Sequence, residues 1–419
     1  MRAAPTAPRS RLGTTKTTDR KTTADRATKW GASYGDSPQA VRAVELFLKQ
    51  APPAAATFVH DFLSARRGTL DEFLLTNLRR SDAPGEEEGV FVRAWQAFAR
   101  GATKRARSNA AERAWTQWRA FGGEDDRALP LHAMPAGEDG HASCVDRTGV
   151  VRIDGCLSAA SAEGLRDFVL ATRDEGVALA AKDKEKGAER LSRVLSARDV
   201  DSEAESRWDV RLPWSTVVRD AVHEMMGARD DPASLGHALS VLSGGDSALL
   251  FECAAVISTE GCAPQIVHAD TVPSEAGAVL HTAFVALQDI SAHQGPTRFL
   301  PHTHNCLRLH GELEREHERG TPESDLLEGA PSVVALLRSG DCTLYDSRTL
   351  HCGGPHVAPP DRTSLPEEPV ERVLFYVSFK HALATEAELA NTDVHGAGSI
   401  LPAVAAMRMC LGSVRSREV

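Results

Sequence analysis

The segment Gln265-Ile-Val-His-Ala-Asp-Thr271 is the most informative part of this 419-residue chain. In a strand, residues two positions apart point to the same side. His268 and Asp270 would therefore offer an imidazole nitrogen and a carboxylate oxygen to one ion. The His-x-Asp pattern alone is a weak signal, because a chain with 16 histidines contains it readily by chance. The flanking segments decide how it is interpreted.

A second histidine, His351, follows Tyr345-Asp-Ser-Arg-Thr-Leu350 and precedes Gly353-Gly354-Pro355. Nine of the 16 histidines lie between residues 268 and 356. Two histidines and one carboxylate on one face of an octahedron leave three positions open, which suits non-haem Fe(II) that binds an oxidant and a cosubstrate. His268, Asp270 and His351 are therefore candidate metal ligands, although this pattern alone adds little.

Several further segments, in the same order along the chain, make the sequence resemble the phytanoyl-CoA dioxygenase family of Fe(II)- and 2-oxoglutarate-dependent oxygenases. The resemblance covers about residues 145–385. It is carried by Gly149-Val-Val-Arg-Ile-Asp-Gly-Cys-Leu-Ser158, Val267-His-Ala-Asp-Thr271, Gly295-Pro-Thr-Arg-Phe-Leu-Pro-His-Thr-His304, Asp346-Ser-Arg-Thr-Leu-His-Cys-Gly-Gly354 and Arg372-Val-Leu-Phe-Tyr-Val-Ser-Phe379.

The expected fold is of the α+β class. From residue 247 onward, apolar runs of five to eight residues alternate with Gly, Pro, Asp and Ser, which is typical of a sandwich or barrel. The resemblance implies a double-stranded β-helix, a cupin-like jelly roll, flanked by helices. We expect a basic, disordered tail over residues 1–30, a helical N-terminal extension over 31–128, and an oxygenase domain over 129–419 with its core at about 145–385.

The resemblance implies that His268, Asp270 and His351 bind Fe(II), and that 2-oxoglutarate and O2 are cosubstrates. It also implies an arginine that binds the distal carboxylate of 2-oxoglutarate. The family usually has this arginine about ten residues after the distal histidine, where Arg362 lies. Arg372 is preferred because it directly precedes an apolar strand, whereas Arg362 precedes a Pro-rich loop. The guanidinium fork suits this task because it makes two parallel charge-assisted hydrogen bonds.

Two more polar residues are candidates for cosubstrate binding. Ser378 lies six residues after Arg372, on the same strand face by period two. Gln265 directly precedes the apolar pair before the His-x-Asp motif. We also expect the segment Arg207-Trp208-Asp209 to form either a substrate-facing loop or an ion-paired structural corner.

The function that the resemblance implies is hydroxylation of a C–H bond in a small-molecule substrate, with release of succinate and CO2. Related halogenases lack the carboxylate ligand, so Asp270 favours hydroxylation. An alternative is a catalytically silent, cupin-like metal-binding or interaction module. The hypothesis of a zinc hydrolase has less support, because it leaves Arg372 and the Gly-Pro segment unexplained. The sequence identifies neither the substrate nor the oligomeric state.

Composition argues against two kinds of partner, nucleic acids and membranes, and bears on the cellular compartment. The net charge of −10 argues against broad nucleic-acid binding, and no apolar run approaches the ~18 residues of a membrane span. The eight scattered cysteines contain no Cys-x-x-Cys pair, which favours reduced thiols in a cytoplasmic protein. Residues 1–30, with eight basic and eight threonine side chains, leave open a mitochondrial or plastid transit peptide.

Overall fold

The computed structural model contains two compact units, and the boundary between them in the sequence lies between residues 106 and 107. The described residues are 38–65, 70, 73–74, 77, 86–122, 129–132, 140–183, 186–187, 191–193, 207–228, 231–271, 278–319, 324–358, 371–384 and 409–416. The expected tail 1–30 and Arg362 lie outside them. The predicted domain boundaries at residues 30 and 128 therefore stay predictions. None of the described helices is both long enough and apolar enough to cross a membrane.

The first unit is helical. It contains α2 (Pro38–Leu48), α3 (Pro53–Ala65) and the first part of α5 (Glu86–Ala120). Both short helices begin at a proline, whose fixed φ suits the first helical turn. Phe47 on α2 packs edge-on against Phe91 and Trp95 of α5, at ring-centroid distances of 5.7 and 5.3 Å. These aromatic residues form part of the buried core of this unit.

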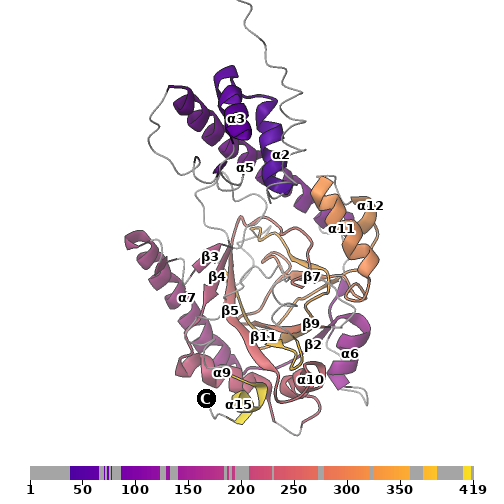
Figure 1. Cartoon of the computed structure of the whole chain (residues 1–419). Coiled ribbons are helices and arrows are strands. Elements are labelled where there is room, and N and C mark those ends of the chain that lie inside the picture. Colours follow the sequence, from indigo (N-terminus) through magenta and orange to yellow (C-terminus); the bar gives the residue numbers. More distant parts are fainter. Residues whose placement is uncertain are drawn as a thin grey trace, which may run out of the picture. The chain divides into compact units, whose positions relative to one another are not determined.

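The second unit contains two β-sheets and confirms the expected fold class (Figure 1). The large sheet has the strand order β2-β9-β6-β11-β5-β4-β3, and all of its neighbouring strands are antiparallel. Its strands are β2 (Val150–Ile153), β9 (Cys342–Asp346), β6 (Leu280–Ala286), β11 (Glu371–Lys380), β5 (Leu249–Thr259), β4 (Arg207–Arg211) and β3 (Leu191–Arg193). The small sheet has the order β1-β8-β7-β10, formed by β1 (Leu129–Pro130), β8 (Val333–Val334), β7 (Thr297–Phe299) and β10 (His351–Gly353).

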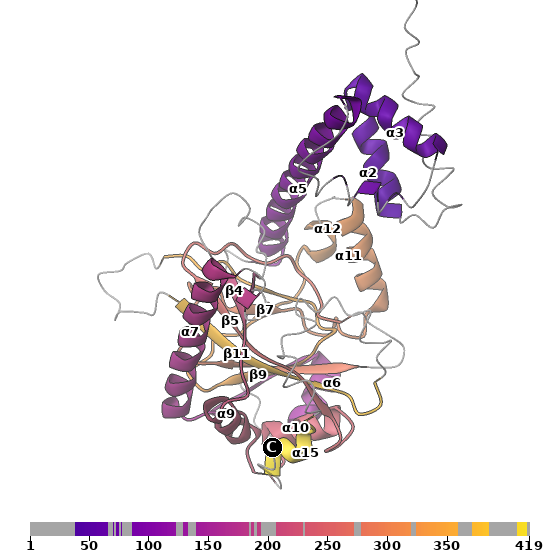
Figure 2. The ribbon, with the colours of Figure 1, turned by 60° about the vertical axis from the view of Figure 1, so that its left-hand side comes forward.

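The large sheet turns its apolar side outward, toward helices (Figure 2). On β11, Val373, Phe375, Val377 and Phe379 alternate with inward-facing residues and join one buried cluster. That cluster also contains residues of the covering helices, which are α6 (Gly140–Thr148), α7 (Ala159–Lys182), α9 (Thr216–Met226), α10 (Leu235–Leu242) and α15 (Leu411–Ser416). At the start of α7, the Ser158 side chain accepts a hydrogen bond from the backbone N–H of Ser161 and so caps the helix.

The small sheet is covered by a separate apolar cluster. Trp118 and Phe121, at the end of α5, pack there with residues of α11 (Leu307–Arg319) and α12 (Ser324–Leu327). Arg298 on β7 stacks on the Trp118 ring, with its Cζ 4.4 Å from the ring centroid. The last turns of α5 are therefore part of the second unit.

Residues 207–211 form strand β4 and not the expected loop or corner. Trp208 and Val210 join the outer apolar cluster, and the charged residues between them alternate with these two along the strand. Arg207, Asp209 and Arg211 consequently face the interior between the two sheets.

Candidate metal centre

Three possible metal ligands meet where the two sheets face each other. His268 and His351 form an isolated antiparallel bridge, in which each backbone N–H donates to the other residue's carbonyl at 2.9 and 2.8 Å. This pairing brings together residues that are 83 positions apart in the chain. The Asp270 backbone N–H donates to Ser347, in the turn between β9 and β10, at 2.8 Å.

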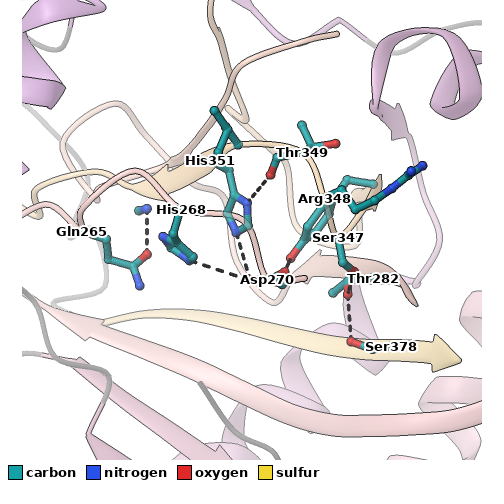
Figure 3. Close-up of polar contacts among 12 residues, drawn as sticks. Gln265, His268, Asp270, Thr282, Ser347, Arg348, Thr349, His351 and Ser378 are labelled. Atoms are coloured by element: carbon teal, nitrogen blue, oxygen red, sulfur yellow. Dashed lines mark hydrogen bonds and ion pairs between the residues drawn. The ribbon is translucent and has the colours of Figure 1, made fainter. Parts of the chain in front are cut away.

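The donor atoms of the triad converge (Figure 3). One nitrogen or oxygen from each of His268, Asp270 and His351 lies within 4.8 Å of the others. The Asp270 Oδ1 atom is 3.8 Å from His268 Nε2 and 3.5 Å from His351 Nε2. Separations of this size fit three ligands around one first-row metal ion, whose bonds to nitrogen and oxygen are about 2.0–2.2 Å long.

Backbone carbonyls fix which ring nitrogen can bind a metal. His268 Nδ1 lies 2.8 Å from the Ile266 carbonyl, and His351 Nδ1 lies 2.9 Å from the Thr349 carbonyl. Because a carbonyl only accepts, each Nδ1 must carry the proton, and each Nε2 keeps its lone pair for a metal. Second contacts of this kind orient metal-ligating histidines in general.

Tyr345 holds the carboxylate ligand in the same way. Its hydroxyl donates to Asp270 Oδ2 at 2.7 Å, which leaves Oδ1 facing both histidines. Burial, with the Asp270 charge beside it, raises the pKa of Tyr345 well above its ordinary value. Tyr345 is therefore protonated at neutral pH and donates this hydrogen bond. Two imidazole nitrogens and one carboxylate oxygen, each with its orientation fixed, fit a facial Fe(II) site.

A cavity lies over the triad, and Arg372 forms part of its wall. The side chain is 2% exposed; its Nη1 donates to the Gly295 carbonyl and its Nη2 donates to Ser258 Oγ at 2.8 Å. Burial and the neighbouring Arg207 charge lower the pKa of Arg372 to about 9, so the side chain is still a cation at neutral pH. The remaining wall is formed by Asp209, Glu252, Val256, Gln265, Thr282, Phe284, Thr297, Tyr345, Gly353, Leu374 and Tyr376.

The two other predicted cosubstrate contacts lie differently. Gln265 lines the cavity, and its Oε1 accepts a hydrogen bond from the Gly353 backbone N–H at 2.8 Å. Ser378 lies on the predicted face of its strand. Its hydroxyl, however, is hydrogen-bonded to Thr282 at 2.9 Å and donates to Glu252 at 2.6 Å. Thr282 and Glu252 line the cavity, and Ser378 lies behind them.

Four other histidines of the second unit have backbone or hydroxyl partners: His281, His304, His310 and His356. His281 lies 3.1 Å from the Ser243 hydroxyl, and burial lowers the pKa of this histidine to about 4. His304, His310 and His356 face the carbonyls of Asp146, Thr303 and Ser258. Among the described residues, His268 and His351 are the only histidines on the cavity wall.

Sequence reasoning missed two tyrosines of the cavity wall, Tyr345 and Tyr376. The chain has only three tyrosines, and two of them line this cavity. The hydroxyl of Tyr376 donates to Asp209 at 2.9 Å, as that of Tyr345 does to Asp270. The scarcity of tyrosine, together with the position of Tyr345 beside the His351 segment, was the available signal.

The comparison with protein families agrees with this geometry. A family model described as phytanoyl-CoA dioxygenase (PhyH) matches residues 145–364, more than half of the chain. The matched range includes His268, Asp270, His351 and Arg362, and it ends before Arg372. None of the curated proteins compared with the chain matches it.

The solved structures that match the chain are distant in sequence. The non-haem alpha ketoglutarate dependent epimerase SnoN from nogalamycin biosynthesis is 22% identical, with a TM-score of 0.35 over 57% of this chain and 80% of its own. The carbocyclase SnoK, from the same biosynthesis, is 17% identical, with a TM-score of 0.39 over 59% and 87%. HygX from Streptomyces hygroscopicus, solved with nickel, 2-oxoglutarate and hygromycin B, is 17% identical, with a TM-score of 0.36 over 58% and 87%.

Proposed function

The chain belongs to the phytanoyl-CoA dioxygenase family of Fe(II)- and 2-oxoglutarate-dependent oxygenases, and from this premise we propose that it hydroxylates a C–H bond of a small molecule. The cosubstrate would leave as succinate and CO2. One observation carries the proposal: the wall of a single cavity contains three converging metal donors and the buried cation of Arg372.

Each residue has a defined task in this proposal. The Nε2 atoms of His268 and His351 and the Oδ1 atom of Asp270 would hold Fe(II). Arg372 would bind the distal carboxylate of 2-oxoglutarate with its guanidinium fork. Bound iron, with 2-oxoglutarate and O2, supplies the oxidising power, and the protein supplies position and surroundings.

The cavity wall also suits a reaction that must exclude water. Val256, Phe284 and Leu374 line it with apolar surface, next to the polar groups that face the triad. An apolar wall of this kind would hold the C–H-bearing part of a substrate and strengthen the electrostatic contacts of its polar neighbours. The intact carboxylate ligand Asp270 supports hydroxylation over halogenation, since related halogenases lack it.

The first test separates an oxygenase from a silent metal-binding module. Protein purified without oxygen is loaded with Fe(II) and then with 2-oxoglutarate, and the visible absorption band of the chelated complex is recorded. Candidate small molecules are then screened with O2 for succinate release and for products that contain one added oxygen atom. Absence of both the absorption band and succinate release would refute the proposal. A band without turnover of any substrate would favour the silent module.

A second test chooses between the two candidate arginines. We expect Arg372→Met to abolish 2-oxoglutarate binding and Arg362→Met to leave it within about twofold. Arg308→Met is the matched control, because the Arg308 side chain is 87% exposed on α11 and pairs with Glu312 there. Loss of binding in Arg362→Met, with Arg372→Met unaffected, would move the cosubstrate site to Arg362.

A further inference from the structure

A second buried arginine lies beside Arg372. Arg207 on β4 pairs in register with Ser258 on β5, and Ser258 pairs with Arg372 on β11. Residues paired in this way project from the same face of the sheet. Both guanidinium groups reach one hydroxyl: Arg372 Nη2 donates to Ser258 Oγ at 2.8 Å, and Arg207 Nε donates to it at 3.4 Å.

The two cations have no anionic partner within the described residues. Arg207 Nη2 donates to the Gly354 carbonyl at 3.1 Å, and neither side chain forms an ion pair with a described carboxylate. Each is 2% exposed, and the Nη1 atom of Arg207 and the Nε atom of Arg372 are buried without a hydrogen-bond acceptor. Two buried like charges without a counter-ion destabilise a protein, so this arrangement needs an explanation.

A third buried arginine shows the usual compensation. Arg298 is 3% exposed and has no carboxylate partner among the described residues either. Its guanidinium stacks on Trp118 and Phe121 at 4.4 and 5.1 Å and donates to the Phe121 carbonyl at 2.5 Å. No described ring stacks on Arg207 or Arg372, so their charges remain available to an anion.

Gly353 places Arg207 close to the cavity. This residue lines the wall, and a Cβ atom added there would lie 2.7 Å from Gln265 Oε1 and 3.3 Å from Arg207 Nη2. A side chain at position 353 would therefore occupy the space between Gln265 and Arg207. Glycine at this position keeps the Arg207 guanidinium next to the cavity wall.

We propose that Arg207 is a positioning residue for the distal carboxylate of 2-oxoglutarate, which enters a field made by two guanidinium groups joined through Ser258. The inference rests on the proposed function. Arg372 would contact the carboxylate, and Arg207 would add a second positive charge and orient the Ser258 hydroxyl. The bound dianion would supply the negative charge that the described protein groups do not. The cosubstrate-free protein would then carry a repulsion that binding relieves.

The test measures cosubstrate binding and stability in the full-length protein. Arg207→Met removes the charge and keeps a long side chain, Arg207→Lys keeps the charge, and Arg298→Met is the matched buried control. The Kd of 2-oxoglutarate is measured by calorimetry on Ni(II)-loaded protein. The Kd of Ni(II) and the melting temperature of the metal-free protein are measured for every variant.

We expect Arg207→Met to raise the Kd of 2-oxoglutarate about tenfold, since a buried charge that faces an anion is lost. Its Ni(II) affinity should stay within about twofold, and its metal-free melting temperature should equal or exceed that of the wild type. Arg207→Lys should recover most of the affinity for 2-oxoglutarate. Arg298→Met should melt lower and bind 2-oxoglutarate normally.

Two results would overturn the inference. One is an Arg207→Met protein that binds 2-oxoglutarate within twofold of the wild type. The other is an Arg207→Met protein that melts lower and loses Ni(II) and 2-oxoglutarate together, because that pattern describes a merely structural arginine. A wild-type protein that binds Ni(II) but not 2-oxoglutarate would instead refute the proposed function, and this inference with it.

Discussion

Replacing Tyr345 with phenylalanine tests how far the surrounding protein determines metal affinity. The Tyr345 hydroxyl is buried and donates to Asp270 Oδ2 at 2.7 Å, which is a charge-assisted hydrogen bond. The ring itself is held by contacts that phenylalanine keeps, with centroids 5.1 Å from Phe299 and 5.2 Å from Phe284. The substitution therefore removes one hydrogen bond and leaves the packing in place.

The expected loss follows from that bond. Hydrogen bonds to charged groups contribute about 1.5–3 kcal/mol, and substitution of a residue that supports a metal ligand typically lowers metal affinity about 10–100-fold. These two ranges agree, because tenfold corresponds to about 1.4 kcal/mol. We expect Tyr345→Phe to weaken binding of Fe(II) or Ni(II) by 10–100-fold, as measured by competition with a chromophoric chelator.

The same cavity offers a matched control. Tyr376→Phe deletes a hydroxyl that donates to Asp209 at 2.9 Å, and Asp209 is outside the triad. Metal affinity should therefore stay within about twofold in Tyr376→Phe. Equal losses in the two variants, or no loss in Tyr345→Phe, would show that the Tyr345 hydroxyl does not orient the ligand.

Three further predictions concern stability. His302→Gly should raise the free energy of unfolding by about 1 kcal/mol in urea, because His302 has a φ of 67°, where glycine is unstrained; an unchanged midpoint would contradict this. Gln117→Leu should lower the free energy of unfolding by about 1–3 kcal/mol and weaken metal binding, because Gln117 Oε1 accepts a hydrogen bond from the buried Val267 N–H at 2.7 Å. Normal metal affinity in this variant would show that the position of His268 does not depend on that hydrogen bond. Burial lowers the pKa of His281 to about 4, so the unfolded chain takes up a proton first as the pH falls. Unfolding free energy should therefore decrease by about 3 kcal/mol from pH 7 to pH 4, and His281→Asn should flatten this slope.

The triad could be predicted from the sequence because its members lie in short motifs with interpretable spacing. The His-x-Asp pattern places two donors on one side of an extended segment, and the segment around His351 identifies the third. The strand after Arg372 could also be predicted, because residues 373–379 form an almost continuous apolar run. Val373, Phe375, Val377 and Phe379 of this run are buried on the outer face. What the sequence could not supply was the backbone pairing of His268 with His351, which depends on the assembled sheets.

Strand β4 shows why the position of other site residues was not predicted. Its sequence, Arg207-Trp-Asp-Val-Arg211, alternates as a strand should, but its charged residues face the interior and its apolar residues face the helices. The prediction of a substrate-facing loop or an ion-paired corner rested on the place of this segment in related enzymes and not on this alternation. Only the pairing of β4 with β5 shows that Arg207 lies in the same row as Ser258 and Arg372.

The two faces of the large sheet therefore have different roles: the outer face stabilises the fold, and the inner face carries the polar groups of the candidate site. The outer face buries apolar side chains against five helices, and the inner face carries Arg207, Asp209, Glu252 and Arg372, whose burial is unfavourable by itself. Successive residues of one strand project from opposite faces of the sheet. Helix packing against the outer face therefore also fixes the register of the residues on the inner face. A strand such as β11 can then keep Arg372 buried and charged beside a like charge, which a loop open to water would not do. That rigidity gives the proposed cosubstrate site a preformed field, so that 2-oxoglutarate binds to charges that are already in position.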